Sequence, residues 1–587
     1  MNARGLAACT ALIGVGLPAW ADDAPERGGV VMQAMRDELA RSVETLQMDR
    51  LEKPYFLSYR IDDVVSTQAV ANFGALADKS SARNRLLSIE IRVGSPDLDN
   101  TNFMPSRVSG SPAARTLTLP LDNDYRELRR QLWLNTDAAY KYALETMAKK
   151  RAALENRSRE ELPDFVPAEA HSSFVEAAPF EPPVEPVAEL VRALSRVFRD
   201  FPGVHASQTC ASHVFTRSYY VNSEGTAFTQ ARPAVFIEAL AKTQADDGTV
   251  LQDFEWFHAR RWEDVPPVEA LAARVRGMAA TLSARRDAPF VDRYSGPVLF
   301  EGQAAAELFA QVLAPKLLAV RVPVAEDTRM EGFTATLRNP FQDKIGARVL
   351  PRGFSVHDDP TLESYAGAPL FGGYPIDDDG IPAAPTALVE NGVLKGLLAT
   401  RNPIDGIARS TGNRRMMGVP LPSNLVVATS RGMSDEEVAE EFKLLIEERG
   451  NDYGVVVRRL ANSMAKLDRS DMARTPRGEV AVDRLTRAYK VFPDGREEAI
   501  RKAELSGVSE SDFRDIVATT ETTTNYTLGF VPTIAYSLAV TTAQYGAVGT
   551  QPAMSIAVPD LLFEELTLRK PVGNVPLPPV ATHPFFD

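Results

Sequence analysis

Few residues in this 587-residue sequence have the types and the spacing that catalysis requires. The six histidines are His171, His205, His213, His258, His357 and His583. No histidine has a second one three to five residues away, so the sequence lacks a zinc-binding helix of the His-Glu-x-x-His type. It also lacks a Gly-x-Ser-x-Gly nucleophile motif and a phosphate-binding Walker loop. The common motifs of zinc proteases, serine hydrolases and nucleotide-binding enzymes are therefore excluded.

His205 and His213 lie on either side of Cys210, in a segment that is expected to form a strand. Both residue types bind zinc, but this spacing matches no common zinc site. Cys210 is the only cysteine that remains if a leader is removed after Ala21, so it can form neither an intrachain disulfide nor a multi-cysteine metal site. We interpret Cys210 as a small packed side chain.

Asp377, Asp378 and Asp379 stand together in the segment "GGYPIDDDGIP". Carboxylates bind hard cations such as Ca²⁺, but the glutamate that closes an EF-hand loop is missing from its place. We therefore expect a solvated turn, with cation binding as the alternative. A second loop, Ser410–Arg415 ("STGNRR"), combines hydroxyls, a glycine and two arginines. Such a loop can receive a carboxylate or a phosphate.

The segment Glu301–Arg321, "EGQAAAELFAQVLAPKLLAVR", begins as a strong helix former. Its alanine, leucine, glutamate and glutamine residues favour a helix up to Leu313. Pro315 then removes a backbone donor and crowds the carbonyl four residues earlier, so we expect the helix to end or kink there. Leu308 is expected to pack in a core, and Glu307 is expected to stay solvated.

The composition is that of a folded, acidic protein. Hydrophobic residues make up 44% of the chain and charged residues 24%, which are ordinary values for globular proteins. The length predicts about two to four domains. A net charge of −13 argues against a nucleic-acid-binding surface, which needs clustered lysine and arginine. No segment after the leader has the ~20 apolar residues that a membrane span needs.

The N-terminus has the pattern of an export signal. Arg4 precedes an apolar stretch from Leu6 to Leu17, and Ala19-Trp20-Ala21 forms an A-x-A cleavage site. Glycines and a proline in this stretch argue against the alternative of a buried N-terminal helix. We predict a signal peptide at residues 1–21, cleavage after Ala21, and a periplasmic or secreted protein.

Local patterns predict the elements that must position these residues. Helical periodicity indicates helices at residues 30–48 and 123–155, and a third after residue 186. Residues 54–80 are expected to form two strands and residues 83–103 another. Turn and cap signals are found at Asn222–Thr226, at Asn391-Gly392, at Pro493-Asp494-Gly495, and in a capping box of Ser434 and Glu437.

These elements suggest three domains after the leader, at residues 22–118, 119–288 and 289–587. A proline-rich stretch at about residues 160–186 has no periodicity, and we interpret it as an extended strap. The aromatic residues that can anchor it are Phe165, Phe174 and Phe180.

Five segments, in order, resemble the TldD/PmbA family, also called the modulator-of-gyrase or peptidase U62 family. They are "RNRLLSIEIRVGSPDLDNTNF", "SYYVNSEGTAFTQARP", "YSGPVLFEGQAAAELF", "GGYPIDDDGIPAAPTALVENGVLKGLLATR" and "VFPDGREEAIRKAELSG". The resemblance spans roughly residues 30 to 565. It implies an α+β fold with an N-terminal α/β lobe, a helical middle region and a C-terminal lobe dominated by antiparallel β-sheet. It also implies dimers, which in the catalytic branch enclose a chamber where unfolded peptides are cut.

In the catalytic branch a helix carries His-Glu-x-x-x-His, and a distant cysteine completes a zinc site. Laid on this sequence, the two histidines fall on Ala310 and Pro315 and the glutamate on Gln311. No cysteine follows Ser295. Zinc needs its thiolate and imidazole ligands, and an amide cannot accept a proton as a general base. We therefore expect no metal, no other cofactor and no catalytic residue at the family's positions.

The resemblance and the lost motif leave three functional hypotheses. The first is an exported, non-catalytic protein that binds extended or unfolded peptides or a partner subunit, as a homodimer or as a heterodimer with a TldD/PmbA-family paralogue. The second is an active peptidase or hydrolase that uses non-standard residues such as Asp377–Asp379, or a metal recruited at a dimer interface. The third is an assembly subunit without a peptide site. We expect neither nucleic acid nor a membrane span in any of them.

Overall fold

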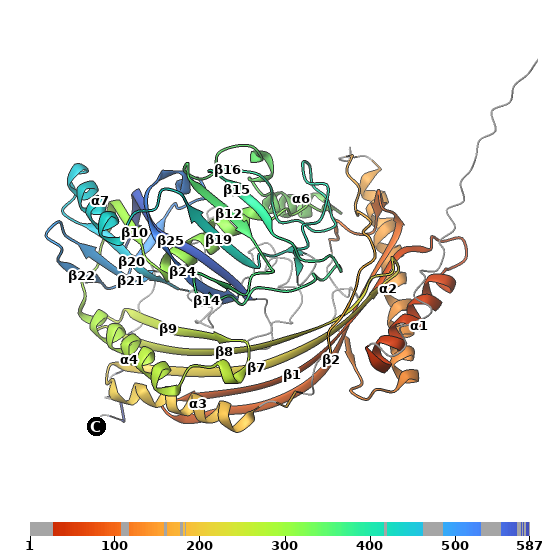
Figure 1. Cartoon of the computed structure of the whole chain (residues 1–587), viewed down its shortest axis with the longest axis horizontal. Helices are drawn as coiled ribbons and strands as arrows, with labels where there is room; N and C mark the ends of the chain where they lie inside the picture. Colours follow the sequence, from red (N-terminus) through yellow and green to blue (C-terminus); the bar gives the residue numbers. More distant parts are fainter. Residues whose placement is uncertain are drawn as a thin grey trace, which may run out of the picture.

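The computed structural model describes residues 28–106, 117–155, 157, 161–176, 180–181, 183–415, 419–461, 485–529, 553–571, 577, 579, 581 and 583–585. The predicted signal peptide, residues 1–21, lies outside this part of the chain. The described residues form two β-rich lobes that face each other, with helices on the outside (Figure 1). This arrangement is the predicted α+β fold.

A long curved sheet forms the N-terminal lobe (Figure 1). Its main strands run in the order β2-β1-β7-β8-β9, and each neighbouring pair is antiparallel. The bounds of these strands are β1 (Pro54–Asn72), β2 (Ala75–Ser95), β7 (Val204–Asn222), β8 (Ala227–Gln244) and β9 (Val250–Ala259). The short strands β3 (Leu98–Asp99), β5 (Leu117–Leu119) and β6 (Ser172–Phe174) extend the sheet.

The two faces of this sheet have different partners. Helices α3 (Val184–Arg196) and α4 (Val268–Ala284) cover one face, and the C-terminal lobe lies over the other (Figure 1). Side chains alternate between the faces along a strand. Val235 and Ile237 on β8 therefore pack in the apolar core under α3 and α4, whereas Gln230 and Arg232 on the same strand point to the C-terminal lobe.

Helices α1 (Gly29–Thr45) and α2 (Tyr125–Leu154) pack together at one end of the sheet, as Figure 1 shows. Their apolar faces share a core with β1, β2 and β7. The Tyr59 hydroxyl on β1 lies 2.7 Å from the Thr136 hydroxyl on α2 and ties the helix to the sheet. Both helices agree with the periodicity of the sequence.

The predicted strap is anchored by the aromatic residues named for it. The Phe165 ring lies under the guanidinium groups of Arg92 and Arg401, at 3.8 and 3.9 Å from its centroid. Phe174 packs against the core of α1 and α2. Phe180 stacks on Phe215, with the ring centroids 5.1 Å apart. Because Arg92 belongs to β2 and Arg401 to the C-terminal lobe, Phe165 connects the two lobes.

The C-terminal lobe is built on a sheet with the strand order β16-β15-β12-β19-β25-β10-β20-β21-β22, to which β23 and β24 add beside β25. Most of its neighbouring pairs are antiparallel, and β10–β20 and β19–β25 are parallel. The strands are β10 (Arg293–Phe300), β12 (Phe354–Asp358), β15 (Thr386–Glu390), β16 (Val393–Leu394), β19 (Asn424–Thr429), β20 (Gly454–Leu460), β21 (Leu485–Val491), β22 (Glu497–Ile500), β23 (Glu504–Ser506), β24 (Ile516–Gly529) and β25 (Ala553–Arg569).

Smaller elements complete the described part. They are α6 (Thr328–Thr334), α7 (Asp435–Glu448), and the short strands β4 (Phe103–Met104), β11 (Val324–Ala325), β13 (Ser364–Tyr365), β14 (Ala368–Pro369), β17 (Arg414–Arg415) and β18 (Val419–Pro420). The predicted capping box of α7 is confirmed by reciprocal hydrogen bonds between Ser434 and Glu437. Among the described residues, no helix combines the length and the apolar character needed to span a membrane.

Two expectations about the sheets need correction or refinement. The third strand predicted at residues 83–103 is the continuation of β2, because β1 and β2 pair along almost their whole length. Strands from residues 22–118 and from residues 119–288 form one sheet, in which β1 pairs with β7. The predicted boundary near residue 118 thus divides the residues of a single sheet.

Gly392 and Gly495 provide a matched pair of turn glycines, with φ of 79° and 85°. A Cβ on Gly392 would lie 2.4 Å from the Leu350 carbonyl oxygen, whereas a Cβ on Gly495 would meet open space. Gly495→Ala should cost about 1–2 kcal/mol, the strain of a left-handed conformation. Gly392→Ala should cost about 1–3 kcal/mol more, because the backbone must also move. Thermal unfolding of both variants is the measurement, and equal losses would contradict the close approach at Gly392.

Candidate functional site

The helix that matches the family's metal-binding segment changes its geometry along its length. Residues Gln303–Leu308 form α5, Phe309–Leu313 a π-helical turn, and Ala314–Leu317 a 3₁₀ turn that contains Pro315. The α-helical part therefore ends at Leu308, earlier than the predicted Leu313. The proline ring crowds the carbonyl four residues before it, so the regular α-helical hydrogen bonds cannot continue through this region.

Three polar side chains lie on one face of this helix, because they are spaced by four residues. Gln303 contacts the end of β20 through both atoms of its amide: Oε1 accepts the Leu460 N–H at 3.1 Å, and Nε2 donates to the Leu460 carbonyl at 3.2 Å. Gln311 Nε2 donates to the Ala461 carbonyl at 3.0 Å and to Glu307 Oε2 at 2.9 Å. We call Gln303, Glu307 and Gln311 the polar row of α5.

Glu307 is only 1% exposed, so the expectation that it stays solvated is wrong. A buried carboxylate needs hydrogen-bond donors, and Gln311 supplies one. Leu308 is fully buried, as expected. The row holds the end of β20 against the helix, and its amides have no acid–base chemistry at working pH.

The residues at the family's metal positions do not fit a zinc ion. Ala310 has no donor atom and is packed in the core at 1% exposure. Pro315 has no ligand atom in its side chain, and the Gln311 amide is engaged by Glu307 and Ala461. Across the part of the chain that the structure describes, no group of three or more His, Cys, Asp and Glu side chains is arranged to hold a metal ion.

The His205–Cys210–His213 arrangement is not brought together on β7. Side chains alternate along a strand, so Cys210 lies on the face opposite to that of His213, while His205 lies in a register shift of β7 against β8. His213 is buried against Phe180, with the ring centroids 4.7 Å apart. Burial lowers the pKa of His213, and the nearby charge of Glu263 opposes this shift. Cys210 and His213 are both buried and serve in packing.

The three aspartates of residues 377–379 do not form a solvated turn. Asp377 is 1% exposed and Asp379 is 2% exposed, so that expectation is wrong. The Asp377 carboxylate accepts the backbone N–H groups of Asp379, Ile381 and Arg414 at 2.8–3.0 Å. These donors oppose the cation alternative too, because a cation would have to displace them.

The other two aspartates pair with arginines across the lobes. Asp378 pairs with Arg60 on β1. Asp379 pairs with Arg414, which also binds Glu90 on β2 at 2.7 Å. The loop Ser410–Arg415, predicted to receive a carboxylate or a phosphate, thus receives carboxylates of the protein itself. We call Arg60, Glu90, Asp378, Asp379 and Arg414 the lobe-junction network.

Sequence reasoning missed Arg60 and Glu90 as partners of these loops. A signal was present: Arg60 and Asp62 on β1, and Glu90 and Arg92 on β2, are pairs of opposite charge two residues apart on one strand. Such pairs share one face of a strand. A face of a long strand that carries paired charges has to meet another polar surface, which here is the C-terminal lobe.

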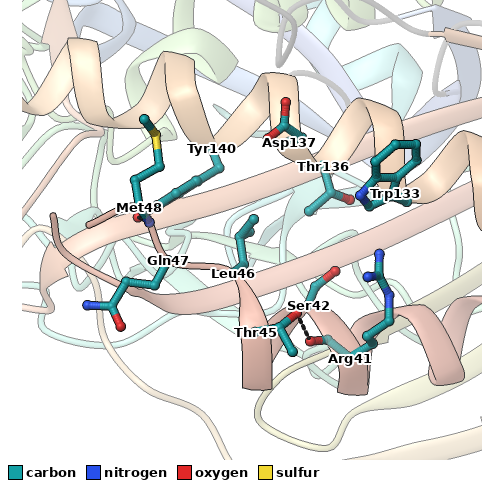
Figure 2. Close-up of a pocket in the computed structure, with 10 residues that line it drawn as sticks. All are labelled: Arg41, Ser42, Thr45, Leu46, Gln47, Met48, Trp133, Thr136, Asp137 and Tyr140. Carbon is teal, nitrogen blue, oxygen red and sulfur yellow. Dashed lines mark hydrogen bonds between the residues drawn. The ribbon is translucent and has the colours of Figure 1, made fainter. Parts of the chain in front are cut away.

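One pocket lies between two of the outer helices, α1 and α2. It lies between the end of α1 and the middle of α2, has a volume of about 180 Å³, and is drawn in Figure 2. Its apolar wall includes Leu46, Met48 and Trp133. The charged residues at its rim are already paired, Arg41 with Glu38 and Asp137 with Lys141. We assign no reaction to it.

Comparison with known proteins gives the class of the C-terminal lobe. Residues 293–569 match the family model of the PmbA/TldA metallopeptidase C-terminal domain. A metalloprotease of Methanocaldococcus jannaschii is 35% identical over 155 residues, which cover 25% of this chain and 33% of that protein. A metalloprotease of Archaeoglobus fulgidus is 32% identical over 135 residues, which cover 22% and 29%. The chain therefore matches about a third of the length of these curated relatives.

Solved structures extend the likeness to the whole fold. TldE from Thermococcus kodakarensis has a TM-score of 0.57 at 16% identity, over 92% of this chain and 100% of that one. A modulator of DNA gyrase from Thermotoga maritima, described as putative, has a TM-score of 0.56 at 15% identity, over 91% and 99%. At these identities the likeness concerns the fold. The C-terminal lobe thus matches a PmbA/TldA metallopeptidase C-terminal domain, and the chain as a whole has a fold similar to that of TldE.

Gln311→Glu tests the polar row of α5. The introduced carboxyl faces Glu307 and the Ala461 carbonyl, where Gln311 now donates, so the protein should lose about 1.5–3 kcal/mol at pH 7.5. Burial beside a second carboxylate favours the protonated form, so the loss should shrink as the pH falls toward 5. Gln311→Met, which removes the donor without adding a second carboxyl, should show a smaller pH dependence. Thermal unfolding at both pH values is the measurement. If the stability loss of Gln311→Glu were the same at both pH values, the assigned contacts would be wrong.

Glu90→Gln tests the lobe-junction network. Burial by itself raises the pKa of Glu90. The charges of Arg414 and Arg92 have the larger effect and lower this pKa to about 2. A carboxyl with a depressed folded pKa stabilises the protein above its unfolded value near 4.5, and this contribution disappears as the pH falls toward 2. Glu90→Gln should therefore cost about 3 kcal/mol at pH 7.5 and progressively less below pH 4.5.

Glu127→Gln is the matched control for that experiment. Hydrogen bonds from Arg130 and Gln131 lower the pKa of Glu127 to the same value of about 2, but this pair lies at the surface of α2. Solvent screens such pairs, so the control should change the thermal midpoint little at any pH. If the two substitutions changed the thermal midpoint equally, burial between the lobes would not be the reason why Glu90 stabilises the protein.

Proposed function

We propose that this chain is an exported, metal-free member of the TldD/PmbA family that binds extended peptides or a partner subunit and does not cleave them. One observation carries the proposal. At the position where catalytic relatives have the general base, Gln311 donates hydrogen bonds to Glu307 and to the Ala461 carbonyl. With Ala310 in the core and Pro315 in the last turn, the helix supplies packing and no catalytic group.

A free strand edge supports the binding part of the proposal. In the part of the chain that the structure describes, residues 75–84 of β2 pair only with β1, and most of them are exposed. An open edge can accept an extended segment as an added strand, with backbone hydrogen bonds supplying affinity. Asp78, Lys79 and Arg83 place charges along this edge, which discourages unspecific pairing. A peptide or a strand of a partner subunit is the occupant that fits.

The experiment combines metal analysis, cleavage and binding on the mature protein. We expect less than stoichiometric zinc, no chelator-sensitive cleavage of an unfolded polypeptide, and retention of that polypeptide by the immobilised protein. A catalytic relative with an intact His-Glu-x-x-x-His motif, assayed in parallel, is the positive control.

Stoichiometric zinc with chelator-sensitive cleavage would overturn the proposal. Chelator-insensitive cleavage would support the alternative of an enzyme with non-standard residues. If only a protein partner is retained, the chain is an assembly subunit. An N-terminus at Asp22 would confirm processing after Ala21.

A further inference from the structure

A second polar cluster lies where the curved sheet faces the C-terminal lobe. Ser218 on β7 is directly opposite Gln230 on β8, and Arg232 follows two residues later on the same face. The Arg232 Nη2 donates to the Ser218 hydroxyl at 3.4 Å. Arg415 approaches from the C-terminal lobe, and its charge is felt at Arg232. We call Ser218, Gln230, Arg232 and Arg415 the junction arginine cluster.

The cluster contains donors that the protein does not satisfy. Gln230 is 2% exposed, and neither its amide oxygen nor its amide nitrogen has a hydrogen-bond partner. A buried amide without hydrogen-bond partners destabilises the folded protein. The Arg415 Nε also has no partner, and its Nη1 lies 3.2–3.5 Å from three backbone carbonyl oxygens. Long contacts of this kind satisfy a guanidinium poorly.

The two arginines of the cluster also lack a direct counter-charge. Among the described residues, no carboxylate lies within 4.0 Å of the guanidinium of Arg232 or Arg415, although every other charge at the lobe junction named above is paired. The neighbouring Arg60 is held by Asp62 and Asp378. Burial lowers the pKa of Arg232, and the charges of Arg60 and Arg415 lower it further, whereas Asp378 and Asp62 oppose this shift. An anion between Arg232 and Arg415 would relieve both this repulsion and the cost of burial.

We propose that the junction arginine cluster binds a carboxylate group, supplied by a small free carboxylic acid or by the C-terminus of a peptide. A planar carboxylate matches the fork of a guanidinium, and the Gln230 amide N–H can donate to it as well. Asp62 and Asp378 stand beside Arg60, so a doubly charged phosphate is disfavoured. Arg232 is half-buried. The site does not depend on peptide binding at the β2 edge, since a free acid can occupy it alone.

The test is titration calorimetry of the mature protein with sodium acetate, with N-acetyl-dialanine, and with its C-terminal amide, at constant ionic strength. Arg232→Met should weaken the binding of acetate or of the peptide acid at least about tenfold. Gln230→Leu should raise the thermal midpoint without ligand, because it removes an unsatisfied buried amide, and should also weaken binding. Arg126→Met, which changes an exposed arginine on α2, should leave binding unchanged.

The outcomes separate the two ligand sources from failure of the proposal. Binding of acetate with no gain for the peptide acid identifies a free acid as the ligand. Tighter binding of the peptide acid than of acetate, with no binding of the amide, identifies a peptide C-terminus. If neither acid binds, or if Arg232→Met and Gln230→Leu bind as well as Arg126→Met, the cluster is hydrated only and the proposal is wrong. If Arg232→Met does not fold, Gln230→Leu decides alone.

Discussion

Charged side chains can be buried between two sheets only if each one finds a partner, because removing an ion from water costs several kcal/mol. The lobe-junction network meets this condition by sharing charges between the lobes. Arg60 and Glu90 come from the curved sheet, while Asp378, Asp379 and Arg414 come from the C-terminal lobe. Neither lobe could bury its own members without the other. The network thus fixes how the lobes face each other, and the junction arginine cluster depends on that arrangement.

The strap also connects the two lobes, through an aromatic side chain that packs against arginines of both. Phe165 lies under one arginine from each lobe, and Asp164 accepts a hydrogen bond from the buried Lys150 of α2 at 2.6 Å. Cation–π contacts of buried arginines contribute about 2 kcal/mol when desolvated. A segment rich in proline, without periodicity of its own, is therefore ordered by a few side chains that reach both lobes.

The helix of the polar row shows how a family helix can keep its packing while its polar side chains take another task. Phe309 and Val312 remain in the core of the C-terminal lobe. Gln303 and Gln311 hold the end of β20 through its backbone. The π-helical turn carries Phe309, Gln311 and Val312, and Pro315 follows in the 3₁₀ turn, so the proline comes after the residues that make these contacts. This division of tasks is the physical basis of the proposed loss of catalysis.

The sequence by itself determined the local features of this protein. Ser434 and Glu437 cap α7, Asn391-Gly392 turns a hairpin, and Pro315 ends a helix, because each depends on residues that are neighbours in the chain. The tertiary structure alone decided that Glu307, Asp377 and Asp379 are buried, and that Gln230 is buried without a hydrogen-bond partner. Burial and charge pairing depend on residues that are more than a hundred positions apart, and no local pattern contains the distance between them. The fold class was therefore predictable from the chain, and the chemistry of the lobe junction was not.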